Sequence, residues 1–178
     1  MTSAELLTDA FGRISETVHE AVEGLTPGQL ATRLDDDANS IGWLCWHLAR
    51  VQDDHVAGAF GVPQVWADAA KRFELPFAPH EIGYGHSSGQ VSQVIVSSGK
   101  LLTEYHDAVH EQTVRLVAGL TDTDLPRVVD EAWDPPVTLS VRLVSVISDC
   151  LQHAGQAAFI RGILLRRGEQ AEGLAGRG

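Results

Sequence analysis

The sequence predicts an all-α protein, a four-helix bundle with long crossover connections in its second half. Four long segments repeat apolar residues at the three- and four-residue spacing of an amphipathic helix, and no segment alternates as a strand would. The 178 residues, 44% of them hydrophobic and 21% charged, suffice for one domain with its own core. We therefore expect a single domain over residues 1–167 and a disordered tail over 168–178, where large apolar residues are scarce.

The first long helix is predicted over residues 4–23. Apolar residues recur there at helical spacing from Leu7 onward, and Ser3 is placed to act as the N-cap. Gly24 is expected to end the helix, because glycine readily adopts the conformation that follows a helix C-terminus.

The second long helix is predicted from Ser40, which can cap it, to Phe60, where Gly61 ends it. The following segment, residues 62–89, is rich in proline and glycine and carries interleaved aromatic residues. A connection of this length inside a small domain usually has a function. We expect it to form a lid or wall over one end of the bundle.

The third long helix is predicted over residues 90–119, and a second connection leads to the fourth, over 139–168. The fourth helix is apolar on more than one side, which is typical of a helix buried among several neighbours. We therefore expect two buried seams. They are Val144, Ile147, Leu151, Ala154 and Ala158, and Val146, Cys150, Ala157, Ile160 and Leu164.

Three polar residues stand among these apolar positions, namely Asp149, His153 and Gln156. Their i, i+4, i+7 spacing places them on one helix face, where a charge without a partner is costly. A metal ion is the economical partner, and His47, in the middle of the second helix on its apolar side, is the best placed third ligand. Two imidazoles and a carboxylate suit zinc first, with nickel, iron and manganese as alternatives. They leave coordination positions open for water or substrate.

The same residues also allow a purely structural interpretation. His47 would then hydrogen-bond a neighbour, and Asp149 would form a buried ion pair. His106 and His110 have the i, i+4 spacing of a metal-binding pair, but charged neighbours favour a solvated face. Cys150 is predicted to be a small buried hydrophobe.

At these residues the chain resembles the DinB/YfiT-like metal-binding superfamily. The resemblance lies in SIGWLCWHLARVQDDHV and DCLQHAGQAAFIRG, and it points to the actinobacterial, mycothiol-dependent branch that includes maleylpyruvate isomerases. It extends from the first helix to about Arg167. It implies a four-helix bundle whose metal is held by three side chains on the second and fourth helices. His47 and His153 match the ligands of that pattern, and Asp149 stands where histidine is frequent.

The resemblance implies a divalent-metal-dependent enzyme that acts on a low-molecular-weight thiol and an electrophile, as a mycothiol S-transferase or isomerase. Asp54 or His55 is placed to act as a proton acceptor, and Arg161, two turns beyond His153, to hold an anionic substrate. Two other functions stay open. One is metal-dependent hydrolysis on the same fold, and the other is a non-catalytic bundle that binds a small ligand or a partner.

Charge and composition narrow the partners and the location. A formal net charge of −11 argues against nucleic acid and anionic membrane surfaces. No apolar run reaches transmembrane length, and the N-terminus lacks the pattern of a signal peptide. Cys45 and Cys150 have no disulfide-framework spacing. We therefore expect a cytoplasmic protein and, by resemblance to related bundles, a homodimer formed by helices packing side by side.

Overall fold

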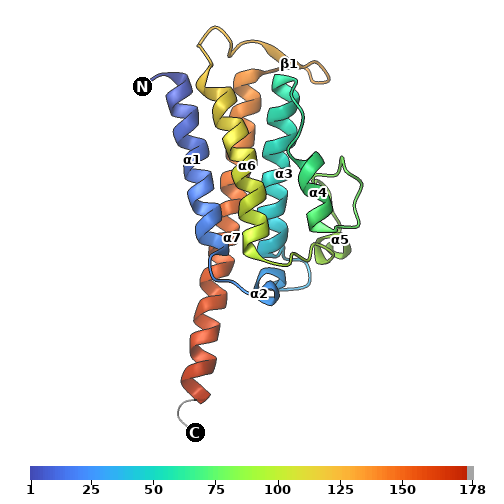
Figure 1. Cartoon of the computed structure of the whole chain (residues 1–178), viewed down its shortest axis with the longest axis vertical. Helices are drawn as coiled ribbons and strands as arrows, with labels where there is room; N and C mark the ends of the chain where they lie inside the picture. Colours follow the sequence, from blue (N-terminus) through green and yellow to red (C-terminus); the bar gives the residue numbers. More distant parts are fainter. Residues whose placement is uncertain (176–178) are drawn as a thin grey trace.

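The structure is a computed structural model that describes residues 1–175, with side-chain burial described through residue 168. Four long helices run along its longest axis (Figure 1): α1 (Ser3–Val22), α3 (Ile41–Phe60), α6 (Gly99–Ala118) and α7 (Leu139–Ala175). The connections hold α2 (Pro27–Ala31), α4 (Trp66–Phe73), α5 (Ser88–Ser92) and a hairpin of β1 (Val128–Asp130) and β2 (Val137–Thr138). The predicted all-α four-helix bundle is confirmed, and the hairpin is an element that the sequence did not predict.

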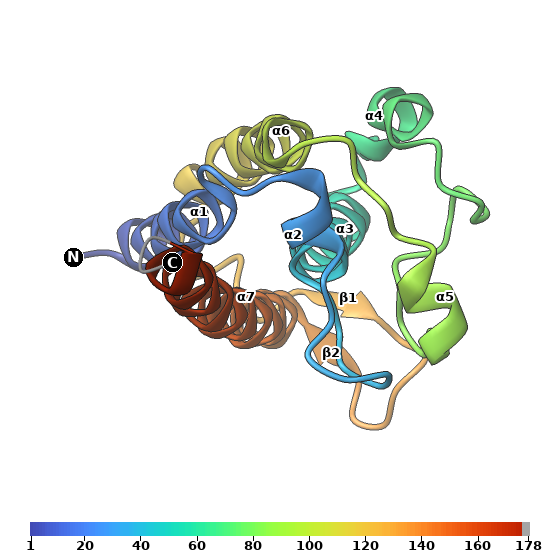
Figure 2. The same cartoon turned by 90° about the horizontal axis from the view of Figure 1, so that it is seen from below.

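Each long helix packs mainly against two others. α3 contacts α7 and α6, and α1 contacts α6 and α7, so α3 and α7 are adjacent along the bundle (Figure 2). The core between them is built from aliphatic and aromatic side chains such as Phe11, Leu48, Leu102 and Leu143. Within the described part of the chain, no helix is long and apolar enough to cross a membrane.

Side-chain caps explain where α1 and α3 begin. Thr2, one residue before the predicted cap, accepts a hydrogen bond from the Glu5 amide and forms a capping box with it. Ser40 caps α3 as predicted, and Gly61 ends it in the left-handed conformation at φ 66°. The predicted ranges of these two helices are therefore correct to within a residue or two.

The third long helix starts later than predicted. α6 begins at Gly99 and is capped by Ser98, whose hydroxyl accepts a hydrogen bond from the Leu101 amide. A Cβ on Gly99 would lie 2.9 Å from the Val22 carbonyl oxygen, so the chain turns here against the end of α1. The prediction of one continuous helix from residue 90 is wrong: residues 90–92 end the short helix α5, and residues 93–98 form an irregular turn with buried valines.

The fourth helix buries one of its two predicted seams in full and the other only in part, through Ala154 and Ile147. The seam through Val146, Cys150 and Ala157 lies in the core, whereas Val144 is 62% exposed and Leu151 is 44% exposed. The physical reason is that α7 packs mainly against α3 and α1, and both lie on the same side of it. An apolar face therefore remains on the outside of the bundle.

The end of the fourth helix also differs from the prediction. α7 runs to Ala175, past the end expected at Gly168 (Figure 1). Residues 168–175 are thus helical, and the last residues of the predicted disordered tail, 176–178, lie outside the described part of the chain.

The long connection between α3 and α6 lies along the outer side of α3 rather than over an end of the bundle (Figures 1 and 2). Its aromatic residues Trp66 and Phe77 contact Trp46 of α3, at ring-centroid distances of 6.2 and 5.9 Å. As a result, α3 is buried on almost every side from Ile41 to Ala57.

Candidate metal centre

The three predicted metal ligands converge between α3 and α7. His47 of α3 and Asp149 and His153 of α7 each offer a ligand atom, and these atoms all lie within 4.8 Å of one another. The rings of His47 and His153 are 4.8 Å apart between centroids, and His153 Nε2 is 3.6 Å from Asp149 Oδ1. This grouping is compact enough for a single ion to gather all three side chains.

His47 is held in the tautomer that a metal ligand needs. Its Nδ1 lies 2.5 Å from the carbonyl oxygen of Ile82, and because a carbonyl only accepts, Nδ1 carries the proton. The lone pair is then on Nε2 and is free for a ligand. Burial lowers the pKa of His47 and outweighs the opposing effect of the Ile82 hydrogen bond. The imidazole is therefore neutral at neutral pH.

His153 and Asp149 form the other half of the site. Gln156 Oε1 lies 3.1 Å from His153 Nδ1, which orients the ring as Ile82 orients His47. Asp149 raises the pKa of His153. Burial raises the pKa of Asp149, but the interaction with His153 and then the charge of His47 outweigh it and leave that pKa below its usual value.

One carboxylate oxygen at the site is left without a partner. Asp149 Oδ2 is buried and accepts no hydrogen bond from any residue that the structure describes. A buried carboxylate oxygen in this position costs free energy unless a cation or donor satisfies it. With two inward nitrogens beside it, the donor set fits a divalent ion such as zinc.

Aromatic rings form one wall of the site. Trp43 stacks on His47 with ring centroids 4.5 Å apart and meets the ring of His153 edge-on at 6.1 Å. The indole N–H of Trp43 donates to Nδ1 of His86 over 3.3 Å. His86 is itself enclosed between Trp46 and Phe77, with ring centroids 5.8 and 4.6 Å away. His86, which sequence reasoning did not identify, thus holds Trp43 in place.

A short segment of the long connection presses against His47. We call residues 79–86 the strap. Within it Gly83 has φ 94°, and a Cβ at this position would lie 2.7 Å from His47 Nδ1 and 3.0 Å from the Trp46 ring. Only glycine allows the strap to approach His47 closely enough for the carbonyl oxygen of Ile82 to accept a hydrogen bond from Nδ1–H.

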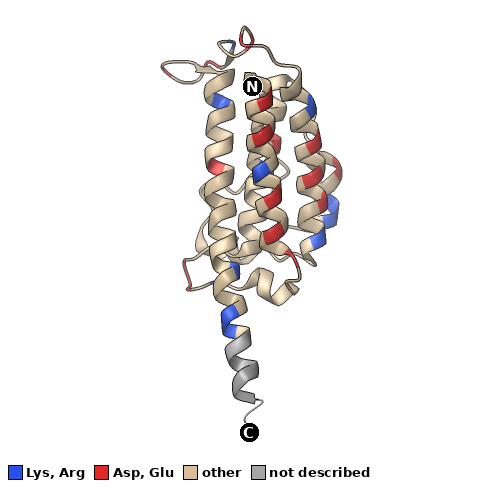
Figure 3. Ribbon diagram, turned by 90° about the vertical axis from the view of Figure 1, so that its left-hand side faces the viewer, with Lys and Arg blue, Asp and Glu red and all other residues tan. Residues whose placement is uncertain are grey.

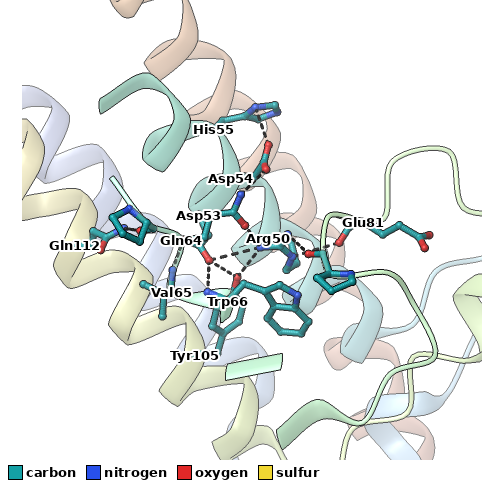
Figure 4. A network of polar contacts seen from close by, with 12 residues as sticks. Arg50, Asp53, Asp54, His55, Gln64, Val65, Trp66, Glu81, Tyr105 and Gln112 are labelled. Atoms are coloured by element: carbon teal, nitrogen blue, oxygen red, sulfur yellow. Dashed lines mark hydrogen bonds and ion pairs between the residues drawn. The ribbon is translucent and has the colours of Figure 1, made fainter. Parts of the chain in front are cut away.

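A buried arginine fastens the strap to α3 (Figure 4). Arg50 is completely buried and donates to the carbonyl oxygens of Pro79 and Glu81, both over 3.3 Å. It also donates to Gln64 Oε1 over 3.0 Å and forms an ion pair with Asp53 at 3.6 Å. The strap is therefore held by hydrogen bonds to a charged group, which are stronger than neutral ones.

Asp53 completes this network from the other side. Its carboxylate accepts hydrogen bonds from the backbone amides of Val65 and Trp66, over 2.9 and 2.8 Å, and from the hydroxyl of Tyr105, over 2.9 Å. Both charges of the Arg50–Asp53 pair are thus hydrogen-bonded, as buried charges must be. The spacing of an arginine and an aspartate at i, i+3 inside an apolar helix was a signal for this network.

The predicted catalytic residues Asp54 and His55 lie two turns of α3 beyond His47, about 10 Å along the axis. They line a polar pocket of about 290 Å³ together with Gln64, Asp130 and Arg142. Arg142 Nη1 lies 3.1 Å from His55 Nδ1, and since arginine only donates, that nitrogen accepts and Nε2 carries the proton. Burial, and then the Arg142 charge, lower the pKa of His55.

Arg161 is not brought to this site. Its guanidinium donates to the carbonyl oxygen of Glu23 over 2.5 Å, at the end of α1. Arg142, which also pairs with Asp130 at 2.6 Å, is the cation that lines the pocket at Asp54 and His55. It occupies the same face of α7 as Asp149, two turns earlier, and this spacing was a signal for it in the sequence.

The protein's own thiols are not available for chemistry. Cys150 is fully buried, as predicted, and contacts the Leu48 carbonyl oxygen. Burial raises the pKa of both cysteines, that of Cys45 to about 12. A reactive thiol at this site would therefore have to come from a substrate.

The histidine pair on α6 differs from its interpretation as a solvated face. His106 is completely buried, and neither ring nitrogen has a hydrogen-bond partner within the described chain. The only group of three or more potential ligands found among the described residues is the one at His47. Within the described residues, the α6 pair therefore belongs to no such group.

The fold and the site define the protein as a DinB-like helical bundle with a candidate metal centre between its second and fourth long helices. The family model described as mycothiol-S-transferase matches residues 6–165. The chain therefore belongs to the mycothiol-S-transferase family, a DinB-like family, and the resemblance drawn from His47 and His153 is confirmed.

A solved structure supports the fold independently. The chain is similar to a protein from Enterococcus faecalis described as a conserved protein of locus, with 28% sequence identity and a TM-score of 0.84. The similarity covers 90% of this chain and 96% of the other. No curated protein matches the sequence.

Proposed function

We propose that this protein is a mycothiol S-transferase that depends on a divalent metal ion held by His47, Asp149 and His153. The observation that carries the proposal is the convergence of two oriented imidazoles on a buried carboxylate whose Oδ2 lacks a partner in the described chain. Family membership supplies the thiol as the expected substrate class. Zinc is the first candidate, because two nitrogens and one oxygen with open positions are typical of catalytic zinc sites.

When bound, a divalent ion would lower the pKa of a thiol that reaches it and so favour the thiolate at neutral pH. The protein's own groups prepare the site for this. Ile82 and Gln156 hold the two imidazoles with their Nε2 atoms available. The face of Trp43 against His47 excludes water from one side, which strengthens the electrostatic interactions there.

The pocket at Asp54 and His55, two turns along α3 from His47, is the place where we expect the electrophilic substrate to bind. Its donors are Arg142 and the Nε2–H of His55, and its carboxylates are Asp54 and Asp130. Because His55 already accepts from Arg142, Asp54 is the better proton acceptor of the two residues that the sequence singled out. Arg142 takes over the anion-binding role expected of Arg161.

Metal stoichiometry tests the ligand assignment. His47→Ala is expected to lose the ion while keeping its helix content, because the apolar core still drives folding. His110→Ala, on α6 and away from the site, is the matched control and should bind metal as the wild type does. Elemental analysis gives the stoichiometry, and circular dichroism checks the fold. Full metal occupancy in His47→Ala would move the site elsewhere.

Turnover separates the enzyme classes that remain open. With zinc loaded, transfer of mycothiol to an electrophile is expected to depend on both the thiol and the metal. Hydrolysis of a substrate by the metal-loaded protein without any thiol would instead favour a hydrolase. A wild-type protein that takes up no zinc, nickel, iron or manganese would leave the bundle as a non-catalytic binding module.

A further inference from the structure

A second pocket lies close to the candidate metal centre, between α7 and the loop that joins α2 to α3. It has a volume of about 310 Å³, and we call it the Phe159 pocket after the exposed phenyl ring that lines it. Its lining includes Leu34, Asp37, Asn39, Gln156, Phe159 and Ile160. Gln156 connects it to the centre, because the same side chain orients the ring of His153.

The Phe159 pocket and the pocket at Asp54 flank the centre on opposite sides. α3 and α7 run in opposite directions along the bundle (Figure 1). Leu44, which lines the Phe159 pocket, precedes His47 by about one turn of α3. Gln156 follows His153 by about one turn of α7, so both lie on the same side of the ligands, about 5 Å along the axis. Asp54 lies on the other side, and the centre is therefore placed between two pockets, an arrangement that suits a reaction between two substrates.

The polar side chains of the Phe159 pocket have unused hydrogen-bonding capacity. Within the described chain, the carboxylate of Asp37 and the side-chain amide of Asn39 make no hydrogen bond, and Gln156 uses only its Oε1, toward His153. A carboxylate accepts several hydrogen bonds, and a side-chain amide both donates and accepts. These groups can therefore bind neighbouring hydroxyl groups of one ligand.

The apolar residues and the charge of the pocket narrow the ligand further. Leu44 and Ile160 are buried, whereas the ring of Phe159 is 64% exposed. α7 carries no charged residue between positions 150 and 160, in contrast to the rows of aspartate and glutamate on α1 and α6 (Figure 3). Among the described residues that line the pocket, Asp37 alone is charged, which disfavours an anion. A neutral ring with apolar faces and hydroxyl groups at its edge fits this combination.

The loop that carries Asp37 is held in place by its own hydrogen bonds. Asp35 Oδ1 accepts hydrogen bonds from the backbone amides of Asp37 and Ala38, over 3.0 and 2.7 Å. Arg33 donates to the carbonyl oxygen of Ala38 over 2.5 Å and to the hydroxyl of Ser88, in α5, over 2.9 Å. A binding loop that is already ordered loses less conformational entropy when a ligand binds.

We propose that the Phe159 pocket binds a hydroxylated ring of the thiol substrate, with one face of the ring on Phe159 and its hydroxyl groups on Asp37 and Asn39. This inference rests on the proposed function and extends it, because mycothiol carries its cysteine on a sugar ring that is linked to inositol. With the rings in this pocket, the cysteine extends toward His153 while the electrophile occupies the pocket at Asp54. The Phe159 pocket then selects a ring-bearing thiol over a small one.

Binding of a thiol-free probe tests this pocket without metal or turnover. The probe is N-acetylglucosaminyl inositol, which has both rings, no thiol and no charge, and the metal-free wild type is expected to bind it in an NMR titration. Asp37→Ala should weaken binding by about tenfold or more, because it removes the charged acceptor. Asp36→Ala, in the same loop but outside the pocket lining, is the matched control and should bind as the wild type does. No binding by the wild type, or unchanged affinity in Asp37→Ala, would overturn the proposal.

Selectivity between thiols tests the same pocket in the zinc-loaded protein. The ratio of kcat/KM for mycothiol to that for N-acetylcysteine should fall about two- to tenfold in Phe159→Ala, because only the larger thiol reaches the ring. Leu165→Ala, at a site 42% exposed further along α7, is the control. If the probe binds but no thiol is turned over, the proposed activity fails and the pocket assignment stands. If mycothiol is turned over and Phe159→Ala keeps the wild-type ratio, the pocket assignment fails and the activity stands.

Discussion

Replacing Gly83 by alanine should weaken metal binding without direct contact between the new side chain and the ion. The added Cβ would lie 2.7 Å from His47 Nδ1, closer than real Cβ atoms approach other atoms. Either the His47 ring or the strap must therefore move. In both cases the 2.5 Å hydrogen bond from His47 to Ile82 is disturbed, and with it the orientation of the ligand.

The size of the effect follows from two separate contributions. Loss of a hydrogen bond that orients a metal-binding histidine typically costs about 10- to 100-fold in metal affinity. Alanine at φ 94° also carries backbone strain of about 1–2 kcal/mol, which lowers the free energy of unfolding. We expect Gly83→Ala to show both effects together.

Gly85→Ala distinguishes the two contributions. Gly85 also has positive φ, at 73°, but a Cβ there meets no atom within 4 Å. This variant should lose a similar amount of stability and bind metal as the wild type does. Zinc affinity is measured by competition with a chromophoric chelator, and stability by urea unfolding. Wild-type affinity in Gly83→Ala, or an equal loss of affinity in Gly85→Ala, would refute the role assigned to the strap.

Three further outcomes are expected. Burial lowers the pKa of His106 to about 4, so below about pH 6.5 this histidine takes up a proton in the unfolded chain but not in the folded one, and the free energy of unfolding falls. His106→Leu should reduce that fall by about 2 kcal/mol between pH 7 and pH 5, measured by urea unfolding. Asp53→Asn leaves Arg50 buried without its counter-charge and should cost about 3–5 kcal/mol, with faster proteolysis of residues 62–86. Asp149→Asn should weaken zinc binding measured by chelator competition, whereas Asp149→His, which keeps a ligand, should retain it.

The bundle was predictable because its helices carry local signals. Ser40 before α3 and Gly61 after it mark that helix without any tertiary information. Where the signal was ambiguous, the prediction failed. Val91 and Val94 have helical spacing and are buried, yet they lie in a short helix and a turn. The Ser98–Gly99 pair was the better indicator, since Ser98 caps the start of α6, whereas the apolar periodicity continues across this point without a break.

The grouping of the candidate metal ligands was predictable for a different reason. Polar side chains on apolar helix faces are conspicuous, and the spacing of Asp149 and His153 placed them on one face in advance. What lies around them was not predictable in this way. The contacts of His47 with Ile82 and of Trp43 with His86 join residues far apart in sequence through an irregular segment. No periodicity describes such a segment, so its register against α3 follows only from tertiary packing.

The strap links the fold of this protein to its proposed chemistry. In a plain four-helix bundle α3 would leave one side in solvent, but here the connection from residue 62 to 98 covers that side and buries it. The covering segment is held by Arg50 and Asp53, whose charges are satisfied only when it is in place. The same segment sets the tautomer of His47 and supports Trp43. The bundle therefore supplies the candidate ligands, while the connection fixes their orientation and the shape of the wall beside them. Within such a fold, substitutions that change the substrate are therefore expected in the connection and the hairpin, where they alter the pocket without removing a candidate ligand.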